Sequence, residues 1–527
     1  MTDQATRADV LIAGAGPTGL VLAIWLTMLK VRVRIIDKAA QPGTTSRALA
    51  IQARTLELYQ QIGLAESVVD RCHKVQAVNL WAKGVRAARV QFGNLGQGIT
   101  PFAFPAILPQ DEHERLLIMR LRELGVEVER PVELTGFEDA GGQIRATLSK
   151  PGSEQTCAFS YLAGCDGARS KVREVLGTGF PGGTYDHLFY VADIEAAGPA
   201  LNGELHIDLE DADFLAVFPL EDTGRARLIG TLRDTGAKDH TAAKDHTATK
   251  DHEHLHFEDV SDRAIRGLKV QIKRVNWFST YRVHHRVADS FRKGRAFLLG
   301  DAAHVHSPVG GQGMNTGIGD AVNLAWKLAA CLKEPAGEAL LDSYEPERMA
   351  FARQLVATTD RAFTAVIDPG ALARFIRTKV VPALAPMVMR VPMVRRAAFR
   401  TVSQTAVNYR RSTLSVGAAG KVHGGDRLPW VKVGAQNSSE FNFAALRSLD
   451  WQIHIYGGAP AGIQALADRR NIPLHVFAWQ SAMKQAGFER DAVYLVRPDG
   501  YVALAAAASG AAAIDGYLNE RNIGAVS

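Results

Sequence analysis

The sequence predicts an α/β protein with an α+β lobe, and three observations lead to this prediction. Near the N-terminus, a short apolar strand, a glycine-rich turn and an apolar helix follow one another in the segment ADVLIAGAGPTGLVLAIWLTML. Segments of strand-like residues between positions 179 and 282 predict a β-sheet lobe. After residue 424, strand-like and helix-like segments alternate again, which predicts a separate small α/β unit.

Composition sets the limits of what the chain can be. Its 527 residues are 47% hydrophobic and 22% charged, which is ordinary for a globular protein with several cores. No apolar run is long enough to span a membrane, and the first residues lack the pattern of a signal peptide. The four cysteines stand apart without a paired motif, so we expect no disulfide framework or metal centre, and a cytoplasmic location. The net charge of +6 comes without the basic and aromatic clusters of nucleic-acid-binding proteins, so we expect no nucleic-acid partner.

The N-terminal glycine-rich turn predicts a dinucleotide-binding site. Its glycines allow a tight turn, close approach of the backbone to a pyrophosphate, and close packing of helix on strand. The residues concerned are Gly14, Gly16, Pro17, Thr18 and Gly19. A second strand, VRVRIID, ends at Asp37 beside Lys38, and a carboxylate there can accept hydrogen bonds from a ribose. The turn alone does not distinguish NAD from FAD.

A second glycine-rich segment, GDAAHVHSPVGGQGMNTGIGDAVNLAWKL, again joins a buried strand to a helix. A nicotinamide dehydrogenase needs one such cradle, whereas a long flavin dinucleotide needs its adenosine end and its ring system held separately. We therefore predict that this loop holds the flavin ring, with backbone N–H groups facing the part that becomes negative on reduction. The residues assigned to it are Pro308, Gly311, Gly313, Met314 and Asn315, and the carboxylate of Asp301 is expected to face the same helix start.

Three motifs together carry a family resemblance: GAGPTGL, CDGARSKVR and the second glycine-rich segment. They resemble the class A flavoprotein monooxygenases, the aromatic hydroxylases related to p-hydroxybenzoate hydroxylase, phenol hydroxylase and the polyketide hydroxylases. The resemblance implies a glutathione-reductase-like Rossmann FAD domain interleaved with a β-sheet substrate domain. It also implies further cofactor contacts, from Arg47, Gln110, Val132, Asp166 and Gly167.

The expected domain boundaries follow from the resemblance and the segment pattern. They are 1–74, 105–178 and 283–360 for the FAD domain, 75–104 and 179–282 for the substrate domain, 361–423 for a helical linker and 424–527 for a thioredoxin-like domain. No cysteine follows Cys331, so we expect a structural role or a homodimer contact from the last domain rather than dithiol chemistry.

The resemblance also implies a reaction. It is a single-component monooxygenase that consumes NADPH or NADH and O2 and hydroxylates a phenolic or polycyclic aromatic substrate through a flavin hydroperoxide. Because the flavin is the reactive group, no side chain is predicted with certainty to be catalytic. Baeyer–Villiger or epoxidising chemistry on a quinone-like or polyketide substrate stays open, as do a non-catalytic flavoprotein and a plain NAD-dependent dehydrogenase.

Candidates for the substrate pocket come from the segments between the motifs. Trp81, Phe104, Phe214 and Phe218 are proposed as wall residues facing the Pro308 loop, with core packing as the alternative for each. A structural role is expected for His206, with proton transfer as the alternative.

Two further segments have unusual compositions. Residues 236–256 repeat the unit KDH, which predicts an exposed insertion whose histidines bind metal at most adventitiously. Between Arg374 and Arg411 the chain carries basic and apolar residues but no acidic residue. A helical linker packed on the body explains this stretch, and a surface that meets anionic lipid or an amphiphilic substrate is the alternative.

Overall fold

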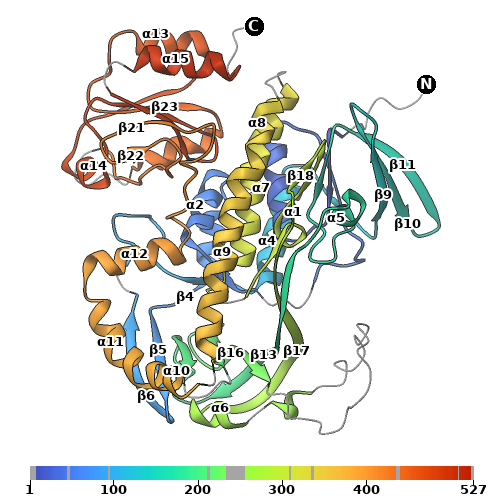
Figure 1. Ribbon diagram of the computed structural model, residues 1–527, viewed down its shortest axis with the longest axis vertical. Helices are drawn as coiled ribbons and strands as arrows, with labels where there is room; N and C mark the ends of the chain where they lie inside the picture. The colour runs from blue at the N-terminus through green and yellow to red at the C-terminus, as the bar shows by residue number, and fades with distance from the viewer. Residues whose placement is uncertain are drawn as a thin grey trace.

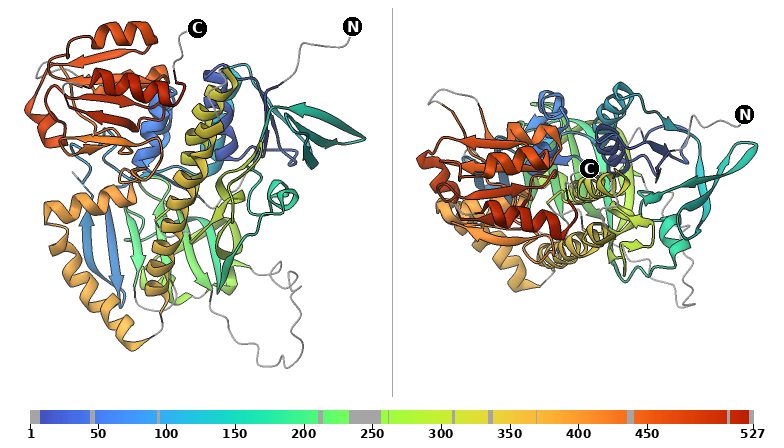
Figure 2. Two further views of the ribbon diagram at one scale, coloured as in Figure 1. Left: turned by 45° about the horizontal axis from the view of Figure 1, so that its top comes forward. Right: turned by 90° about the horizontal axis from the view of Figure 1, so that it is seen from above.

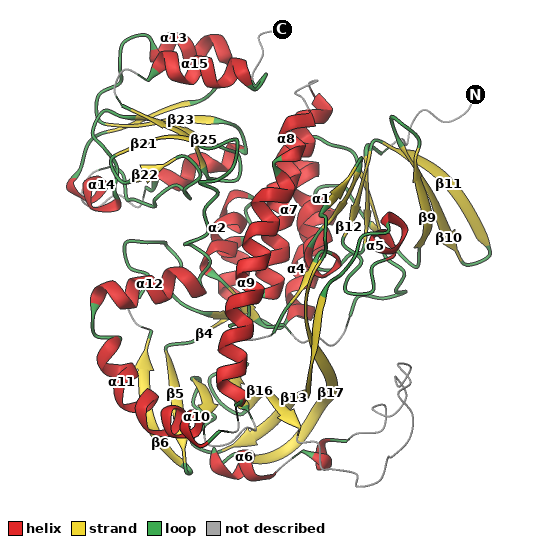
Figure 3. Cartoon of the chain, in the orientation of Figure 1, coloured by secondary structure: helices red, strands yellow, loops and turns green. Residues whose placement is uncertain are grey.

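The computed structural model describes residues 8–43, 48–92, 95–209, 214–232, 256–260, 262–307, 310–333, 338–368, 370–434, 440–507 and 510–523. Helices and sheets are mixed throughout this part of the chain (Figure 3), as the sequence predicts. Among the described residues, no helix is both long and apolar enough to cross a membrane.

A mostly parallel sheet forms the centre of the N-terminal lobe. Its strand order is β18-β19-β12-β1-β2-β8, and only β18 runs antiparallel to its neighbour. The strands are β1 (Val10–Ala13), β2 (Val33–Ile36), β8 (Val128–Glu129), β12 (Tyr161–Gly164), β18 (Arg292–Lys293) and β19 (Ala296–Leu298). All of β1 is buried, as is typical of a parallel strand covered on both faces.

Three helices pack together beside this sheet (Figure 1). Helix α1 (Pro17–Met28) contacts both α4 (Gln110–Glu123) and α7 (Gly313–Lys333). Residues Gly19 to Leu26 of α1 are all buried, because the helix is enclosed by the sheet and the two other helices. The two glycine-rich segments of the sequence are therefore brought to neighbouring helix starts.

The second lobe is an eight-stranded sheet that lies below the first in Figure 1. Its order is β20-β17-β13-β16-β15-β14-β5-β6. The strands are β5 (Ala77–Ala82), β6 (Val85–Gln91), β13 (Gly182–Ala197), β14 (Leu205–Asp208), β15 (Leu215–Pro219), β16 (Arg225–Leu232), β17 (Gln271–Val287) and β20 (His304–Val305). Segments far apart in sequence, 77–91 and 182–287, thus form one sheet, whose outer face is covered by α6 (Asp262–Gly267).

Smaller elements complete this half of the molecule. The three-stranded sheet β11-β10-β9 projects at one side, and the sheet β3-β7-β4 lies between the two lobes. Their bounds, with those of the short helices, are β3 (Ala50–Ile51), β4 (His73–Lys74), β7 (Ala106–Ile107), β9 (Glu133–Asp139), β10 (Ile144–Lys150), β11 (Ser153–Phe159), α2 (Ala53–Gln61), α3 (Ala65–Arg71) and α5 (Lys171–Leu176).

A helical segment leads from α7 to the C-terminal lobe. Helix α8 (Glu338–Asp342) precedes α9 (Tyr344–Ile367), which runs from the upper lobe to β17 of the lower sheet. An arc of helices then curves around the sheet edge beside β6 (Figure 2, left). It consists of α10 (Ala371–Phe375), a π-helical turn (Ile376–Val380), α11 (Val381–Val388) and α12 (Pro392–Val402).

The C-terminal lobe is a third, mixed sheet, ordered β22-β21-β26-β25-β23-β24. Its elements are β21 (Val416–Ala419), β22 (Val422–His423), β23 (Gln452–Tyr456), β24 (Leu474–Phe477), β25 (Val493–Val496), β26 (Val502–Ala506), α13 (Ile463–Arg470), α14 (Ser481–Ala486) and α15 (Ala511–Glu520). Strand β21 pairs in parallel with β26 through Val416 and Leu504. The sheet therefore starts inside the segment expected to be linker.

Candidate functional site

The first glycine-rich turn leaves open space in front of helix α1. Gly14 has φ +102°, and a Cβ there would lie 2.3 Å from the carbonyl oxygen of Cys165. A Cβ on Gly19 would lie 2.0 Å from the carbonyl oxygen of Gly14, so neither position accepts a side chain. Gly16 differs, because a Cβ there would meet nothing within 4 Å. Gly16 is also the N-cap residue of α1, and no side chain accepts a capping hydrogen bond there. The first N–H groups of the helix therefore face this space.

Asp37 is fixed beside this turn at the end of β2. Its Oδ2 accepts a hydrogen bond from the backbone N–H of Ala15 (2.8 Å), and its Oδ1 lies 3.2 Å from Nη1 of Arg130. The backbone N–H of Val132 donates to the carbonyl oxygen of Asp37 (2.9 Å), so Val132 adjoins it while Lys38 is exposed. Arg130 was not singled out in the sequence, since one arginine in a loop carries no signal.

Thr18 joins the two glycine-rich segments. A Cβ on Gly300 would lie 2.7 Å from Oγ1 of Thr18, and a Cβ on Gly317 would lie 2.3 Å from the same atom. The first turn of the N-terminal motif therefore packs directly on the second motif. Two segments almost three hundred residues apart form a single site.

Asp320 of α7 fixes the turn at Gly300, at the start of the second glycine-rich segment. Its Oδ2 accepts hydrogen bonds from the backbone N–H of Gly300 (3.0 Å) and from Nε2 of His304 (2.7 Å), and its Oδ1 lies 2.6 Å from Nε of Arg348. Burial alone would raise the pKa of Asp320, but the charges of Arg348 and His304 hold it below its ordinary value. With the turn fixed in this way, the side chain of Asp301 is exposed at the site.

Asn315 uses its whole side chain to fix the start of α7. Its Oδ1 accepts from the backbone N–H of Gln52 and from Oγ1 of Thr55, both at 2.8 Å. Its Nδ2 donates to the carbonyl oxygens of Ala50 (2.9 Å) and Gly311 (2.8 Å). The amide is thus saturated within the protein, and a contact to a cofactor can come only from the backbone at the helix start.

Several other predicted residues surround the same space. Asp166 caps α5, since its Oδ2 accepts from the backbone N–H groups of Lys171 (2.7 Å) and Val172 (3.1 Å). Its Oδ1 is buried without a partner among the described residues, and a Cβ on Gly14 would lie 2.9 Å from the Asp166 Cα.

Gln110 begins α4 and donates from Nε2 to Glu114 (2.7 Å). Gly167 adopts φ +79°, Gly313 and Met314 open α7, and Arg47 and Pro308 lie outside the described residues.

His306 is a site residue that the sequence analysis missed. Its Nδ1 bonds the carbonyl oxygen of Ser307 (2.7 Å), whereas its buried Nε2 has no partner among the described residues. A Cβ on Gly313 would lie 3.6 Å from this Nε2, which places the ring at the start of α7. Burial lowers the pKa of His306 to about 4. A histidine directly before the Pro308 loop was the available signal.

One face of the eight-stranded sheet packs against the segments beside the two glycine-rich turns. Phe214 and Phe218 pack on that face, in a cluster that also contains Leu49 and Ile107 from the segments beside α7. We call it the inner face; its other members include Val191, Ile229, Trp277 and Tyr281. Phe104 lies apart from it, against the core of the upper lobe and under the ammonium of Lys74, which is 5.3 Å from the ring centroid.

Trp81 and His206 lie on the opposite face of this sheet. Trp81 belongs to the cluster beneath α6, and its Nε1 donates to Nδ1 of His206 (2.8 Å). The other ring nitrogen of His206 lies 2.8 Å from Oδ1 of Asn202, and burial lowers the pKa of His206 to about 4. Both nitrogens are therefore engaged in the structure. These two residues are not brought together with the cofactor turns, because strand alternation turns them away.

The inner face instead presents an ion pair between a buried arginine and a partly buried aspartate, which the sequence analysis missed. Nε and Nη2 of Arg227 lie 2.6 and 2.7 Å from the two carboxylate oxygens of Asp193. The Arg227 guanidinium is also 5.5 Å from the ring centroid of Trp277. The alternation of RARLIGTL places Arg227 on the same face as Ile229, two residues later, but it does not identify Asp193 as the partner.

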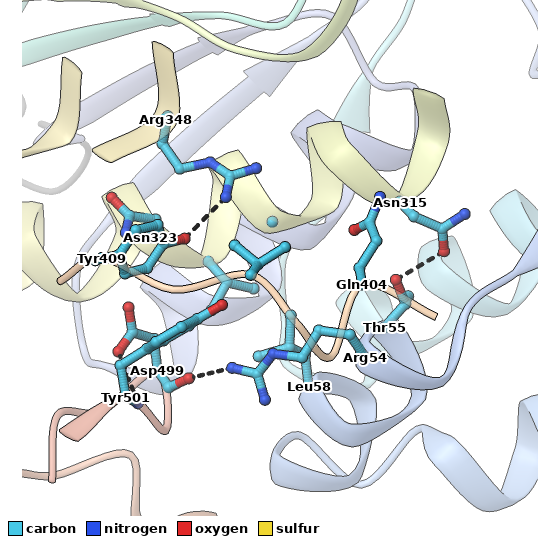
Figure 4. A pocket seen from close by; sticks show the side chains of 13 residues that line it. Arg54, Thr55, Leu58, Asn315, Asn323, Arg348, Gln404, Tyr409, Asp499 and Tyr501 are labelled. Atoms are coloured by element: carbon cyan, nitrogen blue, oxygen red, sulfur yellow. Dashed lines mark hydrogen bonds between the residues drawn. The ribbon is translucent and has the colours of Figure 1, made fainter. Parts of the chain in front are cut away.

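A small internal pocket lies on the far side of α7, between the N-terminal and C-terminal lobes (Figure 4). It has a volume of about 20 Å³, room for roughly one water molecule. Arg54 donates to the carbonyl oxygen of Asp499 (2.6 Å), and Arg348 donates to the hydroxyl of Tyr409 (2.8 Å). The pocket is too small for an organic ligand, and the hydrogen bond from Arg54 to Asp499 beside it joins the two lobes.

Comparison with known proteins identifies the class of protein that this site defines. Residues 7–359 match the family described as "FAD binding domain". The chain is 36% identical over 438 residues to a 6-methylpretetramide 4-monooxygenase of Streptomyces rimosus, covering 81% of this chain and 74% of the relative. It is 31% identical over 514 residues to the 12-dehydrotetracycline 5-monooxygenase/anhydrotetracycline 6-monooxygenase of Streptomyces rimosus subsp. rimosus, covering 95% of this chain and 96% of the relative.

A solved structure shows the same fold along the whole chain. The OxyS anhydrotetracycline hydroxylase from Streptomyces rimosus superposes with a TM-score of 0.76 and 28% identity, over 99% of this chain and 100% of that one. The chain therefore belongs to the family of FAD-dependent monooxygenases, as the three motifs predict, and FAD is its cofactor.

Proposed function

We propose that the protein is a single-component monooxygenase that uses NADPH or NADH and O2 to hydroxylate a polycyclic aromatic substrate of polyketide type. The observation that carries this proposal is the junction at Thr18, where both glycine-rich motifs form one cradle beside an aromatic sheet face. The polyketide substrate class is supported by the named activities of the tetracycline monooxygenases.

The residues of the cradle fit FAD. Gly16 leaves free space where the backbone must approach a pyrophosphate. Oδ1 of Asp166, which has no partner among the described residues, offers a buried acceptor next to the same turn. In this proposal Asp37 holds the adenosine ribose, and the start of α1 holds the pyrophosphate. When bound and reduced, FAD supplies the activation of O2 and the transfer of one oxygen atom to the substrate.

The protein's own residues orient the ring system and keep water away from it. Asp301 would hold the ribityl or pyrophosphate region of the cofactor, and the backbone N–H groups from Gly313 to Asn315 would stabilise negative charge at the start of α7. Asn315 and Asp320 do not contact the cofactor through their side chains in this proposal. Asn315 fixes the start of α7, and Asp320 fixes the Gly300 turn. Because Nδ1 of His306 donates to the carbonyl oxygen of Ser307, Nε2 of the neutral ring is an additional acceptor at this position.

The substrate lies, in this proposal, between the start of α7 and the inner face of the sheet. Phe214 and Phe218 supply apolar contact area, and the Arg227–Asp193 pair supplies the polar group that orients a phenol or a ketone. Trp81 and His206 have no part in the pocket. No side chain is assigned as a proton carrier.

We also propose the finer architecture expected from the sequence. The parallel sheet with α1 after β1 supports a glutathione-reductase-like Rossmann domain interleaved with the eight-stranded substrate sheet. The mixed C-terminal sheet with α13 and α15 supports a thioredoxin-like domain that starts at Val416 rather than at residue 424.

Substitution of Gly16 tests the cofactor site. Gly16→Val should weaken FAD binding about tenfold or more, because its side chain fills the pyrophosphate space while the N-cap change costs only about 1 kcal/mol of stability. Gly142→Val is the matched control, since a Cβ at Gly142 also meets nothing within 4 Å. The flavin-to-protein absorbance ratio after gel filtration reports binding. Equal flavin retention in both variants would refute the assignment.

The reaction itself is tested by aerobic oxidation of NADPH and of NADH with a panel of phenols and polycyclic polyketides. Stimulation together with a hydroxylated product, identified by mass spectrometry and NMR, supports the proposal. Oxygen inserted into a ring, or an epoxide, indicates the alternative chemistry on the same scaffold. Absence of both stimulation and product across the panel counts against turnover of this substrate class.

A further inference from the structure

The arc of helices α10 to α12 exposes apolar side chains to an unusual degree. Met387 is 67% exposed and Met393 is 76% exposed. Further exposed apolar residues of the arc are Leu372, Phe375, Ile376, Val381, Leu384, Val388, Val391, Val394 and Val402. Elsewhere in the described chain, exposed residues of this size are scattered singly, as at Val85 and Met119. Exposed apolar side chains are therefore concentrated on the arc, in contrast to the rest of the described surface.

Packing on the body accounts for only a few residues of the arc. Phe399 of α12 is buried beside Ala53 and Leu95. Arg377 is buried and donates to the carbonyl oxygens of Ala365 (3.2 Å) and Asp368 (2.6 Å) at the end of α9. These contacts fix the arc against the molecule and leave its outer side uncovered.

The charges on the arc have one sign. Exposed basic residues are interspersed with the apolar ones, at Arg374, Lys379, Arg390, Arg396 and Arg400. No acidic residue occurs in the sequence between Asp368 and Asp426. Pairing this surface with the same surface of a second copy would bring like charges together without compensation.

We propose that α10, the π-helical turn, α11 and α12 form a peripheral docking surface for a bilayer that contains anionic phospholipid. Apolar side chains enter the interfacial region, while arginine and lysine side chains reach the lipid phosphates. No described helix can span a membrane, so attachment through the described part of the chain is at the surface. The proposal is independent of the oxidation chemistry, because the arc contributes none of the residues of the cofactor cradle.

Flotation of the flavin-loaded protein with lipid vesicles tests this surface. We expect binding to vesicles of phosphatidylcholine with phosphatidylglycerol and much weaker binding to phosphatidylcholine alone, because each basic residue near an anionic surface contributes about fivefold to partitioning. Binding should weaken as salt is raised. The double variant Met393→Ser/Arg396→Glu should reduce partitioning roughly tenfold or more.

The chain offers a matched control on α4. Met119→Ser/Arg122→Glu changes a methionine and an arginine at the same spacing, and Met119 is 52% exposed. It should leave vesicle binding unchanged, and both variants should keep the flavin content and thermal midpoint of the wild type.

Three results would overturn the proposal. The first is that the wild type fails to float with anionic vesicles. The second is equal loss of binding in both double variants, which would place the effect outside the arc. The third is a concentration-dependent dimer, seen by light scattering and abolished by Met393→Ser/Arg396→Glu, without vesicle binding, which would make the arc a protein contact.

Discussion

At the residue scale, burial and hydrogen bonding determine which polar side chains are available for proton transfer or for contact with a ligand. Asp320 and Asn315 are saturated by hydrogen bonds inside the protein, so they position the cofactor turns instead of reacting. The sequence analysis expected a structural role for His206, with proton transfer as the alternative, and its two ring nitrogens lie 2.8 Å from Nε1 of Trp81 and Oδ1 of Asn202. A histidine in a buried strand is identified as structural only when its partners are known.

Buried neutral histidines predict a loss of stability in mild acid. Burial lowers the pKa of His113, which bonds Tyr59, and of His454, which bonds Gln452, to about 3 each. The unfolded chain binds protons at these residues below about pH 6.5, whereas the folded chain does not, so stability falls as the pH falls. Each residue should cost about 2 kcal/mol between pH 7 and pH 5.

Urea unfolding at pH 7 and pH 5 measures this cost. Replacing either histidine by glutamine should flatten the pH dependence by that residue's share, whatever it does to stability at pH 7. An unchanged pH dependence in both variants would show that these histidines are protonated in the folded state.

At the element scale, the period of two in the strands divides the aromatic residues by function. Phe218 lies on the inner face and Trp81 beneath α6 on the other face, although both had been expected to line one pocket. The sequence shows that residues alternate, but not which face meets the cofactor. Only the packing of β3 and β7 against the inner face decides it.

Alanine substitutions separate the two faces. Phe218→Ala should raise KM by about tenfold through lost substrate contact, with a modest loss of stability. Trp81→Ala should lower the free energy of unfolding by about 3–5 kcal/mol while KM changes little. Steady-state kinetics and urea unfolding of both variants measure the contrast. A larger rise in KM for Trp81→Ala than for Phe218→Ala would reverse the assignment of the faces.

At the scale of the whole molecule, a buried ionic network ties the C-terminal lobe to the cofactor lobe. Both guanidinium Nη atoms of Arg497 bond Glu347 on α9, at 2.8 and 3.0 Å, and Nζ of Lys327 on α7 lies 2.9 Å from the same carboxylate. Burial lowers the pKa of Lys327 to about 8, with Glu347 partly opposing the shift. Trp326 completes the contact, donating to Asp499 at 3.1 Å.

Removing Arg497 should destabilise the whole chain. Arg497→Met leaves Glu347 short of a buried counter-charge and should cost about 3–5 kcal/mol in urea unfolding. Arg490→Met, at a position whose side chain is 68% exposed, is the control and should cost less than about 1 kcal/mol. Limited proteolysis should release the C-terminal lobe in Arg497→Met alone. Equal stability of the two variants would show that the lobes are held by apolar packing.

The sequence by itself determined the local chemistry of the cofactor turns. Gly14 and Gly19 indicate a nucleotide-binding turn because a Cβ at either position would overlap the backbone, and Gly16 leaves the space before the helix open. The family followed from the same motifs, which lie in continuous segments and need no long-range contact to be recognised.

Only the tertiary structure decided how these parts meet. The junction at Thr18, the clamp of Asn315 and the ion pair of Arg227 with Asp193 join residues far apart in sequence, and no local pattern encodes such pairs. The start of the C-terminal sheet at Val416 escaped prediction for the same reason, since a short strand is defined by its partner β26. Local propensity identifies the elements, whereas side-chain burial and long-range pairing choose which faces and which charges come together.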